Sequence, residues 1–77
     1  MSEIQLADGI VADPAVCGGR PRIKGTRVRV SDILAALAAG DSADQIVEAL
    51  PYVTHSDVVA ALRYASMSLD NKVAFAA

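Results

Sequence analysis

Tryptophan is absent from this 77-residue chain, and cysteine, histidine and phenylalanine occur once each. A single cysteine cannot close an internal disulfide, and one cysteine with one histidine cannot supply the ligands of a structural zinc site. The acidic residues are scattered without a histidine or cysteine constellation, so there is no candidate catalytic set for acid–base or metal chemistry. The sequence therefore predicts a protein that is not an enzyme and that uses no metal or cofactor.

Long apolar runs are also missing. No stretch of about 18 uninterrupted apolar residues exists, which predicts a protein that does not span a membrane. The first residues lack the basic stretch and apolar run of a secretion signal. We therefore expect the chain in the cytoplasm.

The material for a core is thin. The chain is 53% apolar, but much of this is alanine, which adds little buried area per residue. A domain of this size buries only about 60% of its unfolded surface. Because disulfides and metals are excluded, a partner chain is the remaining source of support, and we expect a homodimer.

The net charge of −2 conceals a segregated layout. Residues 20–29 hold five of the seven basic residues and no acidic residue, so this segment carries +5 and the other 67 residues carry −7. Such segregation is a feature of interaction surfaces that the total charge does not reveal.

The first 30 residues predict short extended elements rather than helix. Residues 1–9 permit a short strand or a loose arm, and Ile10–Ala12 is typical of a strand that Asp13-Pro14 ends. Residues 22–30 predict a small hairpin or an extended, turned segment, with Arg27 and Arg29 on one solvent-exposed face and Val28 and Val30 on the other.

Two helices follow, each with its own start and stop signals. Ser31 is a candidate N-cap for the first, and Gly40 occupies the position of a left-handed C-terminal residue. Ser42 and Gln45 have the spacing of a capping box for the second, which Pro51 ends.

The third helix is expected over residues 54–69. Thr54 and Asp57 form a second capping box, and Val53 and Val58 are spaced as a hydrophobic staple. One apolar face is expected to be buried along this helix, made by Val58, Ala61, Leu62, Ala65 and Leu69.

These elements predict one mainly α domain over residues 1–77. It comprises short strands and a basic loop (1–30), a helix-turn-helix-like three-helix bundle (31–69) and a C-terminal tail (70–77). The second and third helices are joined by a short link, as in a helix-turn-helix. Many helical bundles share this outline.

A set of motifs along residues 10–66 resembles one family of short bacterial proteins. These motifs are Asp13-Pro14, Cys17-Gly18-Gly19, Pro21, Gly25-Thr26-Arg27, Gly40, Leu50-Pro51, Ala61-Leu62 and Tyr64-Ala65. The family is the VapB-like antitoxins, formerly a domain of unknown function. The resemblance implies a homeodomain-like or winged-helix-like DNA-binding fold, a PIN-like ribonuclease toxin as partner, and repression of the pair's own promoter.

The basic segment is the first candidate for DNA contact, with its glycines permitting close approach of the backbone. The candidates are Arg20, Arg22, Lys24, Thr26, Arg27 and Arg29. The alternative is that these arginines pair with acidic residues or are simply solvated. For Thr26 and Arg27 a structural role is favoured, in a fixed turn whose arginine bonds helix-end carbonyls.

The third helix would conventionally read bases through its N-terminal residues. Its candidates are His55, Ser56 and Arg63, while Asp57 would repel phosphate. We therefore expect the basic segment to contribute more DNA affinity than this helix.

The tail supplies the candidates for toxin contact that the resemblance suggests. Phe75 would fill an apolar pocket and Lys72 would approach acidic metal-binding residues of the nuclease. A frayed helix end is the alternative for these residues. A second function also stays open, that of a protein–protein interaction module with little DNA binding.

Overall fold

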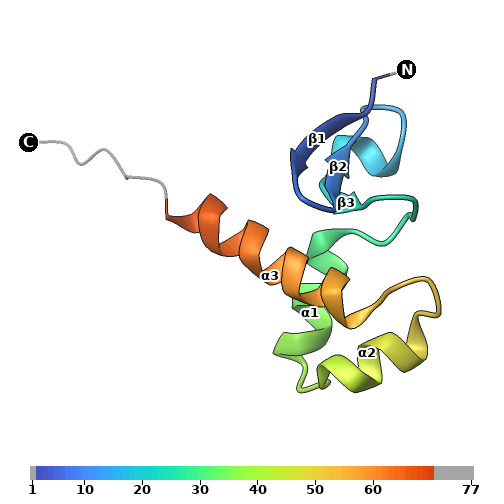
Figure 1. Ribbon diagram of the computed structural model, residues 1–77, viewed down its shortest axis with the longest axis vertical. Helices are drawn as coiled ribbons and strands as arrows, with labels where there is room; N and C mark the ends of the chain where they lie inside the picture. The colour runs from blue at the N-terminus through green and yellow to red at the C-terminus, as the bar shows by residue number, and fades with distance from the viewer. Residues whose placement is uncertain (1, 71–77) are drawn as a thin grey trace, which may run out of the picture.

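The computed structural model describes residues 2–70 of the chain (Figure 1). Three strands and a short 3-10 turn come first, followed by three α-helices. In order these are β1 (Ile4–Ala7), β2 (Ile10–Ala12), η1 (Cys17–Gly19), β3 (Arg22–Ile23), α1 (Val30–Ala38), α2 (Ala43–Ala49) and α3 (His55–Leu69). The predicted three-helix bundle with a short N-terminal β element is confirmed.

The strands form one antiparallel sheet in the order β1-β2-β3. Gln5 pairs with Val11 across β1 and β2, and Ile10 pairs with Ile23 across β2 and β3. The turn between β1 and β2 contains Gly9 with a positive φ of 78°, a conformation that favours glycine. β2 is the central strand, and Ile10 and Val11 are both buried.

The start of α1 differs from the prediction. The N-cap is Arg29, not Ser31, and the helix begins at Val30. The carboxylate of Asp32 accepts the backbone N–H of Arg29 at 3.0 Å and its side-chain Nη2–H at 2.9 Å. Because the acidic residue three positions on satisfies the first backbone donor, the helix begins earlier than the Ser31 signal indicates.

The other helix ends lie as predicted. The N–H groups of Gly40 and Asp41 bond the carbonyls of Leu37 and Ala36, each at 3.0 Å. This is the Schellman pattern, with Gly40 at a φ of 101°.

Both capping boxes are also present. Ser42 and Gln45 exchange side-chain-to-backbone bonds of 2.8 and 3.1 Å at the start of α2. Thr54 and Asp57 do the same at 2.9 and 3.2 Å at the start of α3. Four backbone donors that a helix leaves unpaired are thereby satisfied by local sequence.

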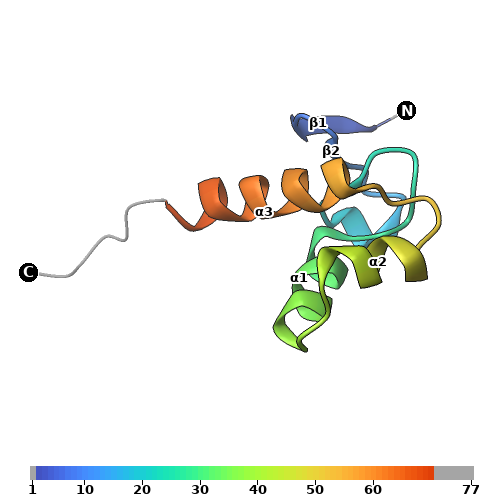
Figure 2. The ribbon, with the colours of Figure 1, turned by 60° about the horizontal axis from the view of Figure 1, so that its bottom comes forward.

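One small core joins the sheet to all three helices. Val53 and Val58, the residues of the predicted staple, both lie in it. Its buried members are Ile10, Ile23, Val30, Ile33, Ile46, Val53, Val58 and Ala61. The N-terminal half of α3 lies between the sheet and the α1–α2 pair (Figure 2), and α3 contacts β2, α1 and α2.

The predicted buried face of α3 is wrong over its second half. Val58 and Ala61 are buried, but Leu62 is 45% and Leu69 is 86% exposed. Figures 1 and 2 give the reason, because the C-terminal part of α3 projects beyond α1 and the sheet. Among residues 2–70, no helix has the length and apolar character to cross a membrane.

The Arg29–Asp32 contact predicts a pH-dependent contribution to stability. The hydrogen bond from Arg29 holds the pKa of Asp32 below its ordinary value of 3.8. A lowered carboxyl pKa stabilises the fold above the unfolded-state value, and the contribution is lost as pH falls through the folded-state value. We expect Asp32→Asn to lower the free energy of unfolding by about 0.5–1 kcal/mol at pH 7.

In urea unfolding near pH 3, the difference between wild type and Asp32→Asn should shrink toward zero. Glu48→Gln, at an exposed acid without a side-chain partner in the described structure, is the matched control and should show no such pH dependence. An equal loss in Asp32→Asn at both pH values would contradict the assignment.

Candidate nucleic-acid interface

The basic segment forms an ordered loop held at both ends by the core. Ile23, at the end of β3, is 2% exposed, and Val30, at the start of α1, is 5% exposed. Between them the N–H of Ile23 donates to the carbonyl of Val28 at 2.8 Å. Lys24 donates its N–H to the carbonyl of Gly9 at 3.0 Å, which ties the loop to the β1–β2 turn.

Thr26 has the structural role that was favoured for it. Its hydroxyl donates to the carbonyl of Ile23 at 2.9 Å and accepts the N–H of Val28 at 3.0 Å. Gly25 sits in this turn at a φ of 79°. The turn is thus fixed by its own residues, and the hydroxyl of Thr26 both donates and accepts a hydrogen bond within it.

Arg27 does not have the role that was favoured for it. Its side chain is exposed, and no bond to a helix-end carbonyl occurs in the described part of the chain. Its backbone carbonyl accepts a weak bond from the thiol of Cys17 at 3.5 Å. The guanidinium of Arg27 is therefore available for a ligand.

Arg22, a candidate for DNA contact, is buried and not exposed. It is 7% exposed and its Nη2 bonds Glu3 Oε1 at 3.0 Å, across 19 positions of sequence. The buried guanidinium pairs with this carboxylate through Nη2 only, its Nε and Nη1 have no partner among the described residues, and its charge is not presented to a polyanion.

Arg29 is also engaged, although it is less buried. Its hydrogen bond to Asp32 raises the pKa of the guanidinium above its ordinary value. Three basic side chains of the segment remain exposed and without an ion-pair partner within residues 2–70: Arg20, Lys24 and Arg27.

Sequence analysis missed Tyr52. This residue lies in the link between α2 and α3 and is 82% exposed. Together with Arg27, it lines an open hollow of about 670 Å³ that also includes Gly25, Thr26 and Val28. A tyrosine in the short link of a helix-turn-helix outline was the available signal, because tyrosine is enriched at contact surfaces.

The N-terminal end of α3 has acidic surroundings. His55 is paired through Nε2 with Asp44 of α2. Ser56 and Arg63 line a second hollow of about 420 Å³ together with Asp8 from the β1–β2 turn. These carboxylates would oppose a phosphate backbone, in line with the expectation that α3 contributes less affinity than the loop.

The remaining predictions concern metal binding and toxin contact. No group of three or more histidine, cysteine, aspartate or glutamate side chains that could hold a metal ion occurs within residues 2–70. The candidates for toxin contact, Lys72 and Phe75, lie outside the described residues.

Comparison with known proteins gives relatives without an assigned function. An uncharacterized protein of Sinorhizobium fredii, y4eO, is 38% identical over 56 residues, which cover 73% of this chain and 25% of the relative. The chain thus spans about a quarter of the length of that relative.

A solved structure gives the same fold. The crystal structure of a DUF433 member protein from Anabaena variabilis has a TM-score of 0.77 and 31% identity, covering 84% of this chain and 64% of the other. A family model matches residues 10–65, which include the basic loop, the core and most of α3. The chain therefore belongs to the family described as "Protein of unknown function (DUF433)".

Proposed function

We propose that this chain is the antitoxin of a bacterial toxin–antitoxin pair. It acts as a cytoplasmic homodimer that binds its own promoter DNA and neutralises a PIN-like ribonuclease, and it is not itself an enzyme. The observation that carries the DNA-binding part is the set of unpaired, exposed side chains of Arg20, Lys24 and Arg27. Lys24 and Arg27 project from a loop whose two ends are buried in the core, and Arg20 lies before that loop, at the end of η1.

The geometry suits contact with the DNA backbone more than base reading. Lys24 and Arg27 flank the tight turn at Gly25, and phosphate contacts of this kind position a protein on a duplex. Tyr52, beside Arg27 in the same hollow, adds a hydroxyl that can donate to a phosphate. The toxin-binding part of the proposal is supported by the resemblance to VapB-like antitoxins alone.

A protein–protein interaction module is the second candidate. It is supported by the net charge of −2, by the acidic residues around the start of α3 and by the exposed Leu62 and Leu69. On this alternative the basic loop is a solvated surface and DNA binding is weak or absent.

Binding of the full chain to its own upstream DNA across a salt series separates the two. A dimer offers six unpaired basic side chains, so the logarithm of the binding constant should fall with the logarithm of salt concentration with a slope of about −5. An unrelated duplex should bind more weakly. Absence of binding to either duplex would favour the interaction module.

Removing two charges from the loop tests where the affinity lies. The double variant Lys24→Gln/Arg27→Gln leaves two contacts per dimer, so the salt slope should fall to about −2. The helix variant His55→Gln/Ser56→Ala is the comparison, and it should keep a slope near that of wild type. A larger loss of affinity in the helix variant would move the site to α3.

The toxin-binding arm has its own test. Co-expression with a PIN-like ribonuclease encoded beside this chain's gene should restore growth, and deletion of residues 71–77 should abolish that rescue while leaving DNA binding unchanged. Full rescue by the shortened chain would exclude Lys72 and Phe75 from toxin contact.

A further inference from the structure

The projecting half of α3 has a face of two leucines with a small serine between them that the other described residues do not cover. Leu62, Ser66 and Leu69 recur at the i, i+4, i+7 spacing that places them on one side of a helix. All three are exposed, Leu69 most of all at 86%. We refer to these three residues as the α3 stripe.

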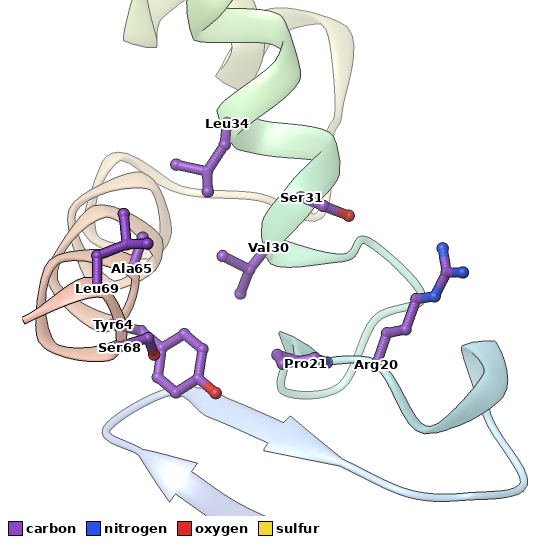
Figure 3. A pocket seen from close by; sticks show the side chains of 9 residues that line it. All are labelled: Arg20, Pro21, Val30, Ser31, Leu34, Tyr64, Ala65, Ser68 and Leu69. Carbon is purple, nitrogen blue, oxygen red and sulfur yellow. The ribbon is translucent and has the colours of Figure 1, made fainter. Parts of the chain in front are cut away.

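A groove lies beside the α3 stripe. This hollow of about 440 Å³ separates α1 from the end of α3. Val30 and Leu34 of α1 point across it toward α3, while the guanidinium of Arg20 points away (Figure 3). Leu69 lines the groove as well as belonging to the stripe, so the two apolar surfaces are continuous.

Two opposite charges flank the stripe. Arg63 follows Leu62 and Asp70 follows Leu69, so the charges are seven residues apart and lie along the same edge of the helix. Both side chains are exposed, and neither has an ion-pair partner in the described part of the chain.

We propose that the α3 stripe and groove are covered by a second copy of this chain, with the two α3 helices antiparallel. A twofold axis near Ser66 then places Arg63 of each copy beside Asp70 of the partner subunit. In a parallel twofold pair the two charged flanks lie on opposite sides of the interface, so Arg63 does not meet Asp70 of the partner subunit. The opposite charges thus select both the orientation and the register.

The same register is sterically favourable. A register that sets residue 63 beside residue 70 brings Leu69 of the partner subunit to the level of Tyr64, which lines the groove. Ser66, a small residue that allows close approach of the helices, lies near the axis. The contact is isologous, as a twofold dimer requires. It assigns Arg63, which the sequence suggested as a DNA contact, to self-association.

The interface rests on the self-association that forms part of the proposed function, but it does not depend on DNA. Only about two helical turns overlap in this register. The contact is therefore smaller than the roughly 800 Å² per partner of a standard interface. We expect a dimer that dissociates at micromolar concentrations.

Sedimentation equilibrium of the full chain, from about 5 to about 500 µM, covers that range of affinity. The average mass should rise with concentration from 8.0 kDa toward twice that value. Arg63→Asp and Asp70→Arg should each weaken the dimer about tenfold, because each replaces two surface ion pairs by two like-charge contacts. The double variant Arg63→Asp/Asp70→Arg should return to within about threefold of wild type, since the pairs re-form with reversed sign.

An apolar pair of variants tests the stripe itself. Leu69→Ala should weaken the dimer, whereas Met67→Ala should not, although Met67 is also 54% exposed, because it lies on the opposite side of α3. Unchanged thermal unfolding of the monomers would show that the fold is kept. Failure of the charge reversal to restore the dimer, or a monomer at every concentration, would overturn the proposal.

DNA binding by the same variants separates this interface from the proposed function. A dimer with the expected charge-reversal pattern and no affinity for DNA would leave the interface standing and reject the repressor. DNA binding by a chain that stays monomeric at all concentrations would reject the interface alone.

Discussion

The two buried ends of the basic loop are the constraint on which the site depends. Ile23 and Val30 are both held in the single core, so the six residues between them have little freedom. The hydroxyl of Thr26 then fixes the turn from within. A loop that is ordered before binding loses less conformational entropy when it meets a ligand, so each exposed charge contributes more of its interaction energy to affinity. Lys24 and Arg27 are presented in this way by apolar residues that contact no ligand themselves.

The same small core explains why α3 is only half covered. The sheet and the α1–α2 pair enclose its N-terminal turns, where Val58 and Ala61 are buried, and nothing in residues 2–70 extends far enough to enclose the rest. A larger core would bury Leu62 and Leu69 within the chain. A domain this short buries a smaller share of its surface than a larger one, which fits the exposure of these leucines within residues 2–70. The small core thus leaves the second half of α3 uncovered, and this uncovered half is the surface that the proposed dimer would use.

Local features could be predicted from the sequence, and long-range ones could not. Both capping boxes and the Gly40 helix end depend on residues within a few positions of one another, and these were correct. The burial of Arg22 depends on Glu3, 19 positions away, which no local pattern indicates. Periodicity identified an apolar side of α3 but could not show where the neighbouring elements stop, so Leu69 was wrongly assigned to the core. Within the candidate site, the charge of the basic segment is visible in the sequence. Which of its arginines are free and which are engaged depends on contacts with other residues, such as that of Arg22 with Glu3.

The position of the acidic and basic side chains limits how a charged partner could approach the molecule. Carboxylates from the β1–β2 turn and from α2 lie near the start of α3: Asp8 lies in the hollow with Ser56 and Arg63, and Asp44 is paired with His55. The basic loop lies beside the link between α2 and α3, and its Lys24 N–H bonds the carbonyl of Gly9, next to Asp8. On the proposed function, a polyanion would be attracted to the loop and repelled by these neighbouring carboxylates, which restricts how it can approach. The net charge of −2 is then compatible with a DNA-binding protein that docks by its loop, whereas a conventional docking through α3 would have to overcome its own carboxylates.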